Sequence, residues 1–391
     1  MCEVLFSQEN KATSGGGAMS LRQRVMGLEG VPGHRTGDAL NAGLEPVEDA
    51  RHKPGGPLPY EWWYFEGTFD NGYSAVVIAW PMNYSKPWRR QCTVQLSIYT
   101  PEGETFKHYI FPPGRDFSAS SDRCDVRVGD SYMRGAYPRY EISMEAEGDR
   151  VDLVFSSEVP GWKPQTGVNV VPFPRLKTMG WVVPVPRARV RGTLTMGDRT
   201  VEVEGHGYHD HNFGEAPIFH SVDNWHWGHI VSGDLGITWA DITMNRSLGY
   251  QHALMFLLSR SGRLVYESPD IRVSYSGWRD DREYLHPFPG VIKVSFGEDG
   301  GPARGEFSMW VREVIETQDL LDMVGIPAPL ARVTHLLSKP YYFRWLSTVE
   351  GSLEVEGEAI SFDGDTIHEQ MLFRGMRPRE MMREDWRNRG R

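Results

Sequence analysis

The feature that most constrains the fold is a succession of short segments in which apolar and polar residues alternate. Val190, Leu194 and Met196 alternate with arginines and threonines, and the alternation resumes at residues 200–204 after Gly197-Asp198. Alternation with a period of two places side chains on the two faces of a β strand, and a Gly-Asp pair between two such runs predicts a hairpin. We predict similar strands at residues 74–79, 91–99, 140–146, 151–156, 236–244, 253–258, 272–275, 291–296, 305–312, 351–355 and 368–373. Many short strands at this spacing predict an all-β sandwich or barrel.

The length of the chain predicts two domains. At 391 residues it exceeds the size, about 250 residues, at which a single hydrophobic core stops growing. We predict a disordered or loosely packed arm at residues 1–53, an N-terminal β domain at 54–218, a C-terminal β-barrel domain at 219–376 and a polar tail at 377–391. Apolar residues at helical spacing predict two short helices, at 317–324 and 329–337, as a cap or packing element in the second domain.

Charge and cysteine content exclude several classes of protein. The formal net charge of −10 argues against nucleic-acid binding, which needs clustered lysines and arginines. No apolar run approaches the roughly 20 residues of a membrane-spanning helix. The three cysteines form no CxxC motif, so neither a disulfide framework nor a thiolate metal site is expected. We expect a cytoplasmic protein without an integral membrane segment, as a monomer or weak homodimer.

The densest group of reactive side chains lies between residues 205 and 241. In a strand Trp225, Trp227 and His229 share one face, and Trp239 shares a face with Asp241. If that second face is buried, desolvation raises the pKa of Asp241 and leaves a neutral acid able to donate a proton near pH 7. The alternative is that Asp241 bonds a neighbouring backbone amide or faces water.

The histidines of the same region raise the question of a metal. His209 and His211 occupy alternate positions, and alternate positions of a strand can offer two imidazoles to one ion. However, no acidic third ligand stands at a recognisable spacing, and Asn212 within a glycine-rich bracket indicates a hydrogen-bonded corner. We therefore expect no metal and no cofactor. The histidines then orient a neighbouring acid or form structural hydrogen bonds.

An acid followed by four aromatic residues opens the first domain. Strand alternation places Glu61, Trp63 and Phe65 on one face and Trp62 and Tyr64 on the other. A buried glutamate needs partners, which a histidine or arginine can supply. Glu61 and Tyr64 are candidates for function, while the other rings are expected to seal the bottom of the barrel.

Five motifs in order resemble one known family, the carotenoid 1,2-hydratase or hydroxyneurosporene synthase family. The resemblance runs from about residue 59 to residue 375. The motifs are EWWYFEG at Glu61–Gly67, GWVVPVPRARVRG at Gly180–Gly192, GHGYHDHNFG at Gly205–Gly214, WHWG at Trp225–Gly228 and TWAD at Thr238–Asp241.

The resemblance implies two lipocalin-like domains with a ligand cavity at their junction. It also implies relatives that hydrate isoprenoid double bonds, including kievitone hydratases, and fungal relatives that guide Diels–Alder cyclisations of polyenes. In the hydratases an Asp after the WxW motif is the proposed proton donor, and that residue matches Asp241. His211, Phe213 and Trp239 match the supporting positions.

We therefore predict an acid-catalysed hydratase or cyclase that acts on an alkene of a hydrophobic isoprenoid or polyene bound between the domains. One alternative is a pericyclase of the Diels–Alderase type, in which a donor such as His211 or Tyr64 polarises a carbonyl. Another is a non-catalytic lipid or pigment carrier. The predicted catalytic residues are Asp241, His211, Trp239 and Glu61. The predicted substrate-binding residues are Tyr64, Trp63, Tyr208, His209, Phe213, Trp225, Trp227, Tyr341 and Tyr342, the last two because they follow the helical segment.

Overall fold

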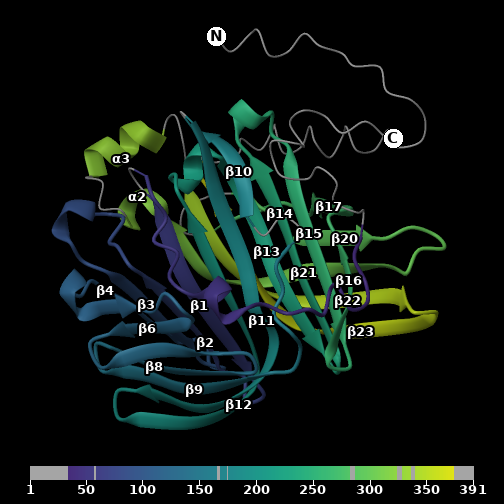
Figure 1. Ribbon diagram of the computed structural model, residues 1–391, viewed down its shortest axis with the longest axis horizontal. Coiled ribbons are helices and arrows are strands. Elements are labelled where there is room, and N and C mark those ends of the chain that lie inside the picture. The colour runs from purple at the N-terminus through teal and green to yellow at the C-terminus, as the bar shows by residue number, and fades with distance from the viewer. Residues whose placement is uncertain are drawn as a thin grey trace.

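The computed structural model confirms the all-β fold class. It describes residues 34–56, 59–164, 168–173, 175–281, 287–323, 328–335 and 340–373. Within these ranges the chain forms two large antiparallel sheets of lipocalin-like form, one of 12 and one of 9 strands, and a small pair of strands (Figure 1).

The first sheet contains the strands that precede residue 215. Its order is β4-β3-β2-β1-β12-β11-β9-β8-β7-β6-β5, with β10 paired to β11. The hairpin predicted around residues 197–198 joins β11 to β12, where Met196 pairs with Arg199. The strands are β1 (Tyr60–Phe69), β2 (Ser74–Trp80), β3 (Thr93–Tyr99), β4 (Thr105–Ile110), β5 (Phe117–Ala119), β6 (Cys124–Val128), β7 (Ser131–Ala136), β8 (Arg139–Ala146), β9 (Asp149–Ser157), β10 (Val168–Phe173), β11 (Arg175–Met196) and β12 (Arg199–Gly214).

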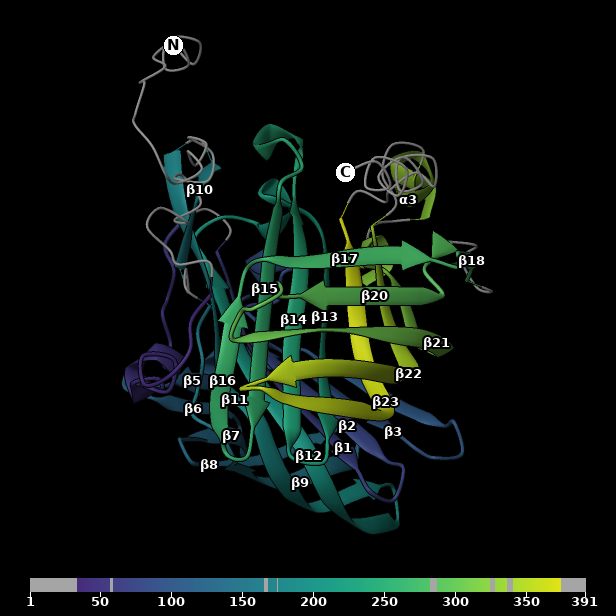
Figure 2. The same cartoon turned by 90° about the vertical axis from the view of Figure 1, so that its right-hand side faces the viewer.

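The second sheet has the order β16-β15-β14-β13-β23-β22-β21-β20-β17. In Figure 2 the strands β17, β20 and β21 cross in front of β13, β14 and β15, so this sheet curls over on itself. Its strands, with the separate pair β18 and β19, are β13 (Val222–Ser232), β14 (Leu235–Met244), β15 (His252–Arg260), β16 (Arg263–Ser268), β17 (Ile271–Ser276), β18 (Arg279–Asp280), β19 (Pro287–Phe288), β20 (Val291–Phe296), β21 (Ala303–Asp319), β22 (Tyr341–Val355) and β23 (Glu358–Leu372).

A short helical insertion interrupts the second sheet between β21 and β22, as predicted. It consists of α2 (Leu320–Met323) and α3 (Ala328–His335). The first helix starts three residues later than predicted, because residues 317–319 still pair with β22 as the end of β21. Pairing along a long hairpin overrides the local helical spacing of this stretch. Residues 324–327 and 336–339, at the ends of the predicted helices, lie outside the described residues.

Strand alternation divides the buried side chains into three main groups. The first fills the curl of the first sheet and contains Trp63, Phe65 and Phe155. The second fills the curl of the second sheet and contains Trp239, Trp345 and other rings. The third is made of residues from both sheets. The two sheets therefore pack against each other through the faces opposite to their own interiors, with β11 and β12 near β13 and β14 (Figure 1).

The described part of the predicted N-terminal arm packs on both sheets. The backbone of Arg35 pairs with Glu267 of β16, and the 3-10 helix η1 (Pro46–Asp49) places Asp49 and Ala50 in buried positions. The prediction of a loosely packed arm is wrong for these residues. It rested on the polar, glycine-rich composition, which does not reveal a few long-range contacts. Residues 1–33 lie outside the described residues.

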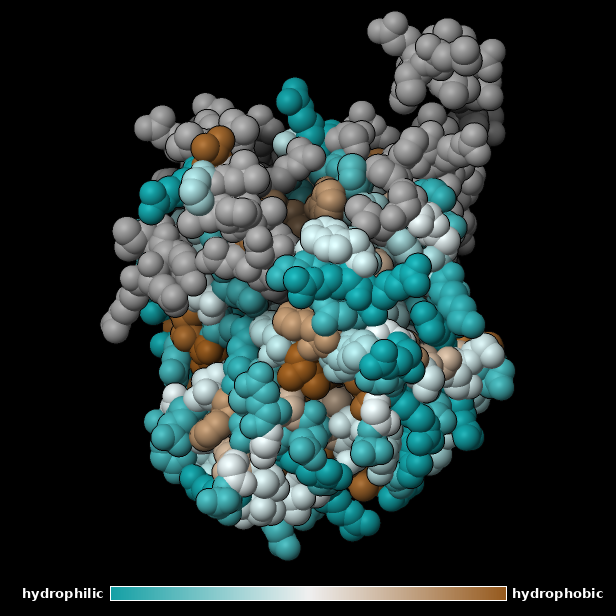
Figure 3. Space-filling view, turned by 90° about the vertical axis from the view of Figure 1, so that its left-hand side faces the viewer, coloured by the Kyte–Doolittle hydropathy of each residue, from teal (hydrophilic) through white to brown (hydrophobic). Residues whose placement is uncertain are grey.

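The division of the chain at residue 218 stays a prediction, although β12 and β13 on either side of it belong to different sheets. The predicted tail at 377–391 lies outside the described residues. In the part of the chain that the structure describes, no helix is long and apolar enough to cross a membrane. Outside the grey atoms, the face in Figure 3 is mostly hydrophilic, with hydrophobic patches scattered among the hydrophilic side chains.

Candidate active site

The candidate site is a pocket where the two sheets meet. Four tryptophans line it, two from each sheet, and two carboxylates lie among them. From the first half of the chain the lining residues are Tyr60, Trp62, Tyr64, Pro164, Met179, Gly180, Trp181, Asp210 and Asn212, and from the second half Ile218, Val222, Trp225, Trp227, Ala240, Ile242, Met255 and Glu369.

Alternation along β12 decides which residues of the histidine-rich motif reach this pocket. Asp210 and Asn212 line it, and Tyr208 donates a hydrogen bond to Asp210 from the same face. His209 and His211 lie on the opposite face, inside the curl of the first sheet. Because neighbouring residues of a strand point to opposite sides, the sequence His-Asp-His presents its acid to the pocket and both imidazoles to the core.

Asp210 is the acid with the environment of a proton donor. Its side chain is buried, and Oδ2 accepts hydrogen bonds from Trp181 Nε1 and from the Tyr208 hydroxyl, both at 3.0 Å. Oδ1 accepts a third bond from Asn212 Nδ2 at 2.9 Å. Burial raises the pKa of Asp210 to about 7, although the bond from Trp181 favours the anion and lowers it. A carboxyl group with this pKa can give or take a proton near neutral pH.

The second carboxylate of the pocket, Glu369 on β23, belongs to a buried polar network. It accepts hydrogen bonds from the Tyr342 hydroxyl and from Arg344 Nη2. Burial raises the pKa of Glu369, and the charge of Arg344 opposes this rise. Arg344 Nη1 also contacts Glu316, at 3.2 Å, and donates to the hydroxyl of Tyr99 on β3 of the first sheet. This network therefore fastens the two sheets together beside the pocket.

The predicted residues Glu61 and His211 meet inside the first sheet. His211 Nε2 lies 3.3 Å from Glu61 Oε1, so a histidine does supply the partner that the buried glutamate needs. The ring of His211 stacks on Trp63, and Phe213 stacks on His52. The predicted substrate-binding residues Trp63, His209 and Phe213 therefore lie on the face of the sheet that points away from the pocket.

The predicted acid Asp241 lies inside the second sheet, not at the seam where sequence reasoning placed it. Oδ1 pairs with His252 Nδ1 at 2.6 Å, and Oδ2 accepts a hydrogen bond from the Tyr275 hydroxyl at 3.0 Å. Trp239 shares its face, as predicted. Trp225 lines the pocket from the opposite face of the sheet. The predicted catalytic residues thus form two groups, Glu61 with His211 and Asp241 with Trp239, on the inner faces of different sheets.

Three predicted substrate-binding residues line the pocket, namely Tyr64, Trp225 and Trp227. Tyr208 and Tyr342 each donate a hydrogen bond to one of its acids, and Tyr341 packs inside the second sheet. Sequence reasoning missed Asp210, Glu369, Trp62 and Trp181 as pocket residues. The alternation that separates Tyr64 from Trp63 would have separated Asp210 from its flanking histidines in the same way.

Comparison with known proteins bears on this geometry. Residues 163–286, which include the motif of β12 and the strands β13 and β14, match the carotenoid hydratase CrtC family. The chain is 24% identical over 276 residues to a hydroxyneurosporene dehydrogenase of Chlorobaculum tepidum, covering 61% of this chain and 70% of that protein. It is 25% identical over 311 residues to an acyclic carotenoid 1,2-hydratase of Thiocapsa roseopersicina, covering 72% and 71%.

The chain is similar to carotenoid hydratases over part of its length. The resemblance predicted from the five motifs is thereby confirmed. The solved structure of kievitone hydratase from Nectria haematococca has the same fold, with a TM-score of 0.52 at 12% identity, and the match covers 86% of this chain and 95% of that one. Asp210 and Asp241 both lie within the stretch that matches the carotenoid hydratase family.

Proposed function

We propose that the chain is an acid-catalysed hydratase or cyclase that binds an alkene-bearing isoprenoid or polyene in the pocket between the sheets. The observation that carries this proposal is the buried carboxyl group of Asp210. Its pKa is raised to about 7, and it lies in a pocket lined by tryptophans. The match to the carotenoid hydratase family supports an enzyme of the hydro-lyase type.

The reaction begins with transfer of the Asp210 proton to one carbon of a trisubstituted alkene. The C=C π electrons form the new C–H bond, and the other carbon becomes a tertiary cation. The Asp210 carboxylate that remains is held by the hydrogen bonds from Trp181, Tyr208 and Asn212. These bonds stabilise the charge as it develops on the acid.

The cation forms in a pocket whose walls attract positive charge. Trp62, Trp225 and Trp227 line it, and the rings of Trp62 and Trp225 stack with centroids 6.4 Å apart across the two sheets. A desolvated cation gains about 2 kcal/mol from the face of one such ring. The same apolar walls exclude bulk water, so capture of the cation depends on what the pocket admits.

Capture completes the reaction in one of two ways. Attack by one water molecule, followed by loss of its proton to Asp210, gives a tertiary alcohol and restores the acid. Attack by an internal hydroxyl group or alkene gives a ring instead. Glu369, which lines the pocket from the second sheet, is a second group able to accept the released proton. The net change is addition of water or an isomerisation, and neither needs an oxidant.

The first test compares two acids in the full-length chain. With an acyclic carotenoid and shorter isoprenoid alkenes as probes, Asp210→Asn should lower turnover by about 10²–10⁴-fold, the usual contribution of a general acid. Asp241→Asn, inside the second sheet, serves as the matched control and should retain turnover. If Asp241→Asn loses turnover and Asp210→Asn retains it, the proton donor is Asp241, as the sequence predicted, and the assignment to Asp210 is refuted.

A second candidate is a pericyclase of the Diels–Alderase type. The observation that favours it is the apolar pocket with the acid Asp210 in its wall, because such a chamber can fold a polyene and a protonated carboxyl group can donate a hydrogen bond to a carbonyl. Turnover in heavy water separates the two reactions. Alkene protonation deposits deuterium on carbon in the product, whereas a pericyclic closure does not. A carrier would release either probe chemically unchanged.

A further inference from the structure

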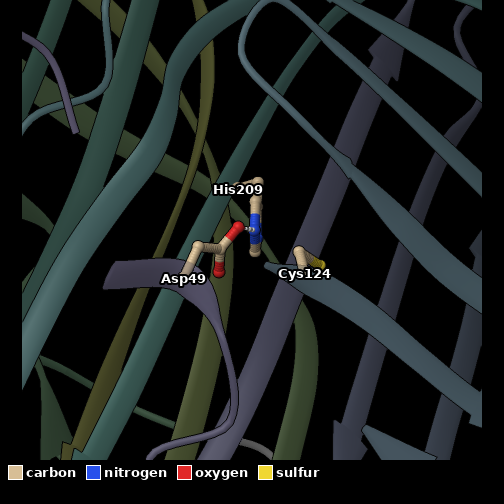
Figure 4. Close-up of side chains that lie close together, drawn as sticks. All are labelled: Asp49, Cys124 and His209. Carbon is tan, nitrogen blue, oxygen red and sulfur yellow. Dashed lines mark hydrogen bonds and ion pairs between the residues drawn. The ribbon is translucent and has the colours of Figure 1, made fainter. Parts of the chain in front are cut away.

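A second group of reactive side chains lies on the other face of β12, inside the first sheet. Asp49 arrives from η1, Cys124 from the start of β6 and His209 from β12, and all three are buried (Figure 4). One ligand atom from each lies within 4.8 Å of the other two. Sequence reasoning gave no metal because no acidic third ligand stood near the histidines, and the fold supplies one from 160 residues away.

The hydrogen bonds of His209 indicate which of its ring nitrogens carries a proton. Nδ1 lies 2.9 Å from the backbone carbonyl oxygen of Tyr64, and a carbonyl oxygen only accepts, so Nδ1 carries a proton. Nε2 then faces Asp49 Oδ2 at 3.0 Å. A neutral ring would direct a lone pair at a carboxylate, so a proton or a metal cation must lie between the two atoms. An outer hydrogen bond from Nδ1 to a carbonyl is the arrangement that metal-bound imidazoles usually adopt.

A further observation favours the cation. Asp49 Oδ1 is buried, and its contact with Nδ1 of the neighbouring His211, at 3.4 Å, is too long for a strong hydrogen bond. A divalent cation would bind the carboxylate oxygens, deprotonate the thiol and leave a neutral set, because one aspartate and one thiolate balance two positive charges.

We propose that Asp49, Cys124 and His209 form a binding site for a divalent transition-metal ion, with Zn²⁺ the best match. The mixture of imidazole, carboxylate and thiolate suits zinc among the common biological ions. Metal–ligand bonds of about 2.0–2.3 Å require the three atoms to approach within about 4 Å of one another, so the side chains close slightly around the ion. The remaining positions are filled by the second oxygen of Asp49 or by water.

The site has a structural role in this fold. Asp49 is the last residue of η1, in the segment that precedes β1, and the other two ligands belong to the first sheet. A bound ion would therefore fix this segment to the inner face of β12, while the pocket acid Asp210 projects from the outer face. The inference does not depend on the reaction in the pocket.

The test is a titration of the chelator-treated, full-length chain with Co²⁺ and then Zn²⁺. Cobalt bound to a thiolate gives a near-ultraviolet charge-transfer band, and we expect it to saturate at one equivalent per chain and to vanish on addition of zinc. Cys124→Ser should abolish the band. Cys92→Ser, which removes another buried free cysteine outside the group, is the matched control and should keep it. Asp49→Asn should weaken cobalt binding at least tenfold.

Thermal unfolding gives an independent readout. Zinc should raise the melting temperature of the wild type and of Cys92→Ser, and should not raise that of Cys124→Ser, since an ion that binds the folded state alone stabilises it. If the proton lies on His209 Nε2 instead, the wild type will show neither a thiolate band nor a zinc-dependent rise, and the proposal is overturned. A band that persists in Cys124→Ser overturns it too.

Discussion

Replacing Asp210 by Asn should make the stability of the protein depend less on pH. Burial raises the pKa of this carboxyl from 3.8 to about 7 in the folded chain. At about 1.36 kcal/mol per pKa unit, the rise corresponds to roughly 4 kcal/mol of folding free energy. The side chain is only 7% exposed, so solvent screening takes little from this figure. Asn keeps the shape of the neutral acid, and the Asn212 amide can rotate to remain its partner.

Because the pKa of Asp210 is higher in the folded state, its contribution to stability decreases as the pH rises. The folded state holds the Asp210 proton to higher pH than the unfolded state, so this contribution to stability is complete below about pH 4 and lost as the pH rises through about 7. Asn cannot ionise and suffers no such loss. The free energy of unfolding of Asp210→Asn relative to the wild type should therefore increase by about 1.4 kcal/mol per pH unit between about pH 4 and pH 7, and stay constant above that.

Urea unfolding of both proteins at half-unit steps between pH 5 and pH 8.5 measures this difference. The two chains share every other titrating group, so their difference isolates Asp210. A difference in unfolding free energy that stays constant or falls between pH 5 and pH 7 would refute the assignment of a neutral acid to this position. It would also remove the main support for the proposed proton donor.

Two further predictions concern the same region. Turnover of an isoprenoid probe should fall as the pH rises through about 7, because Asp210 must be protonated to donate, and a pH profile of kcat/KM that rises there would contradict this. Arg344→Met should lower the free energy of unfolding by about 3–5 kcal/mol, since the buried Glu369 loses this cation and Glu316 keeps only Lys107 as a cationic partner. The control Arg260→Met, which breaks the surface pair with Glu358, should change the urea midpoint little.

The faces of the strands could be predicted from the sequence alone. Alternation correctly put Trp63 and Tyr64 on opposite sides of β1, and the turn at residues 197–198 located the hairpin of β11 and β12. It also paired Asp241 with Trp239 on one face. These results are local: a side chain in a strand points opposite to its neighbours whatever lies beyond the sheet.

Which face meets which partner was decided by the tertiary structure. The outer faces of the two sheets pack together, so the pocket receives Asp210 and Glu369, while Asp241 turns into the second sheet. The segment before β1 carries Asp49 to His209 across 160 residues. A period of two sorts residues into two sets but does not say which set a distant sheet will cover. Which face is covered depends on the burial of apolar area between segments far apart in the sequence, and this burial is present only in the folded chain.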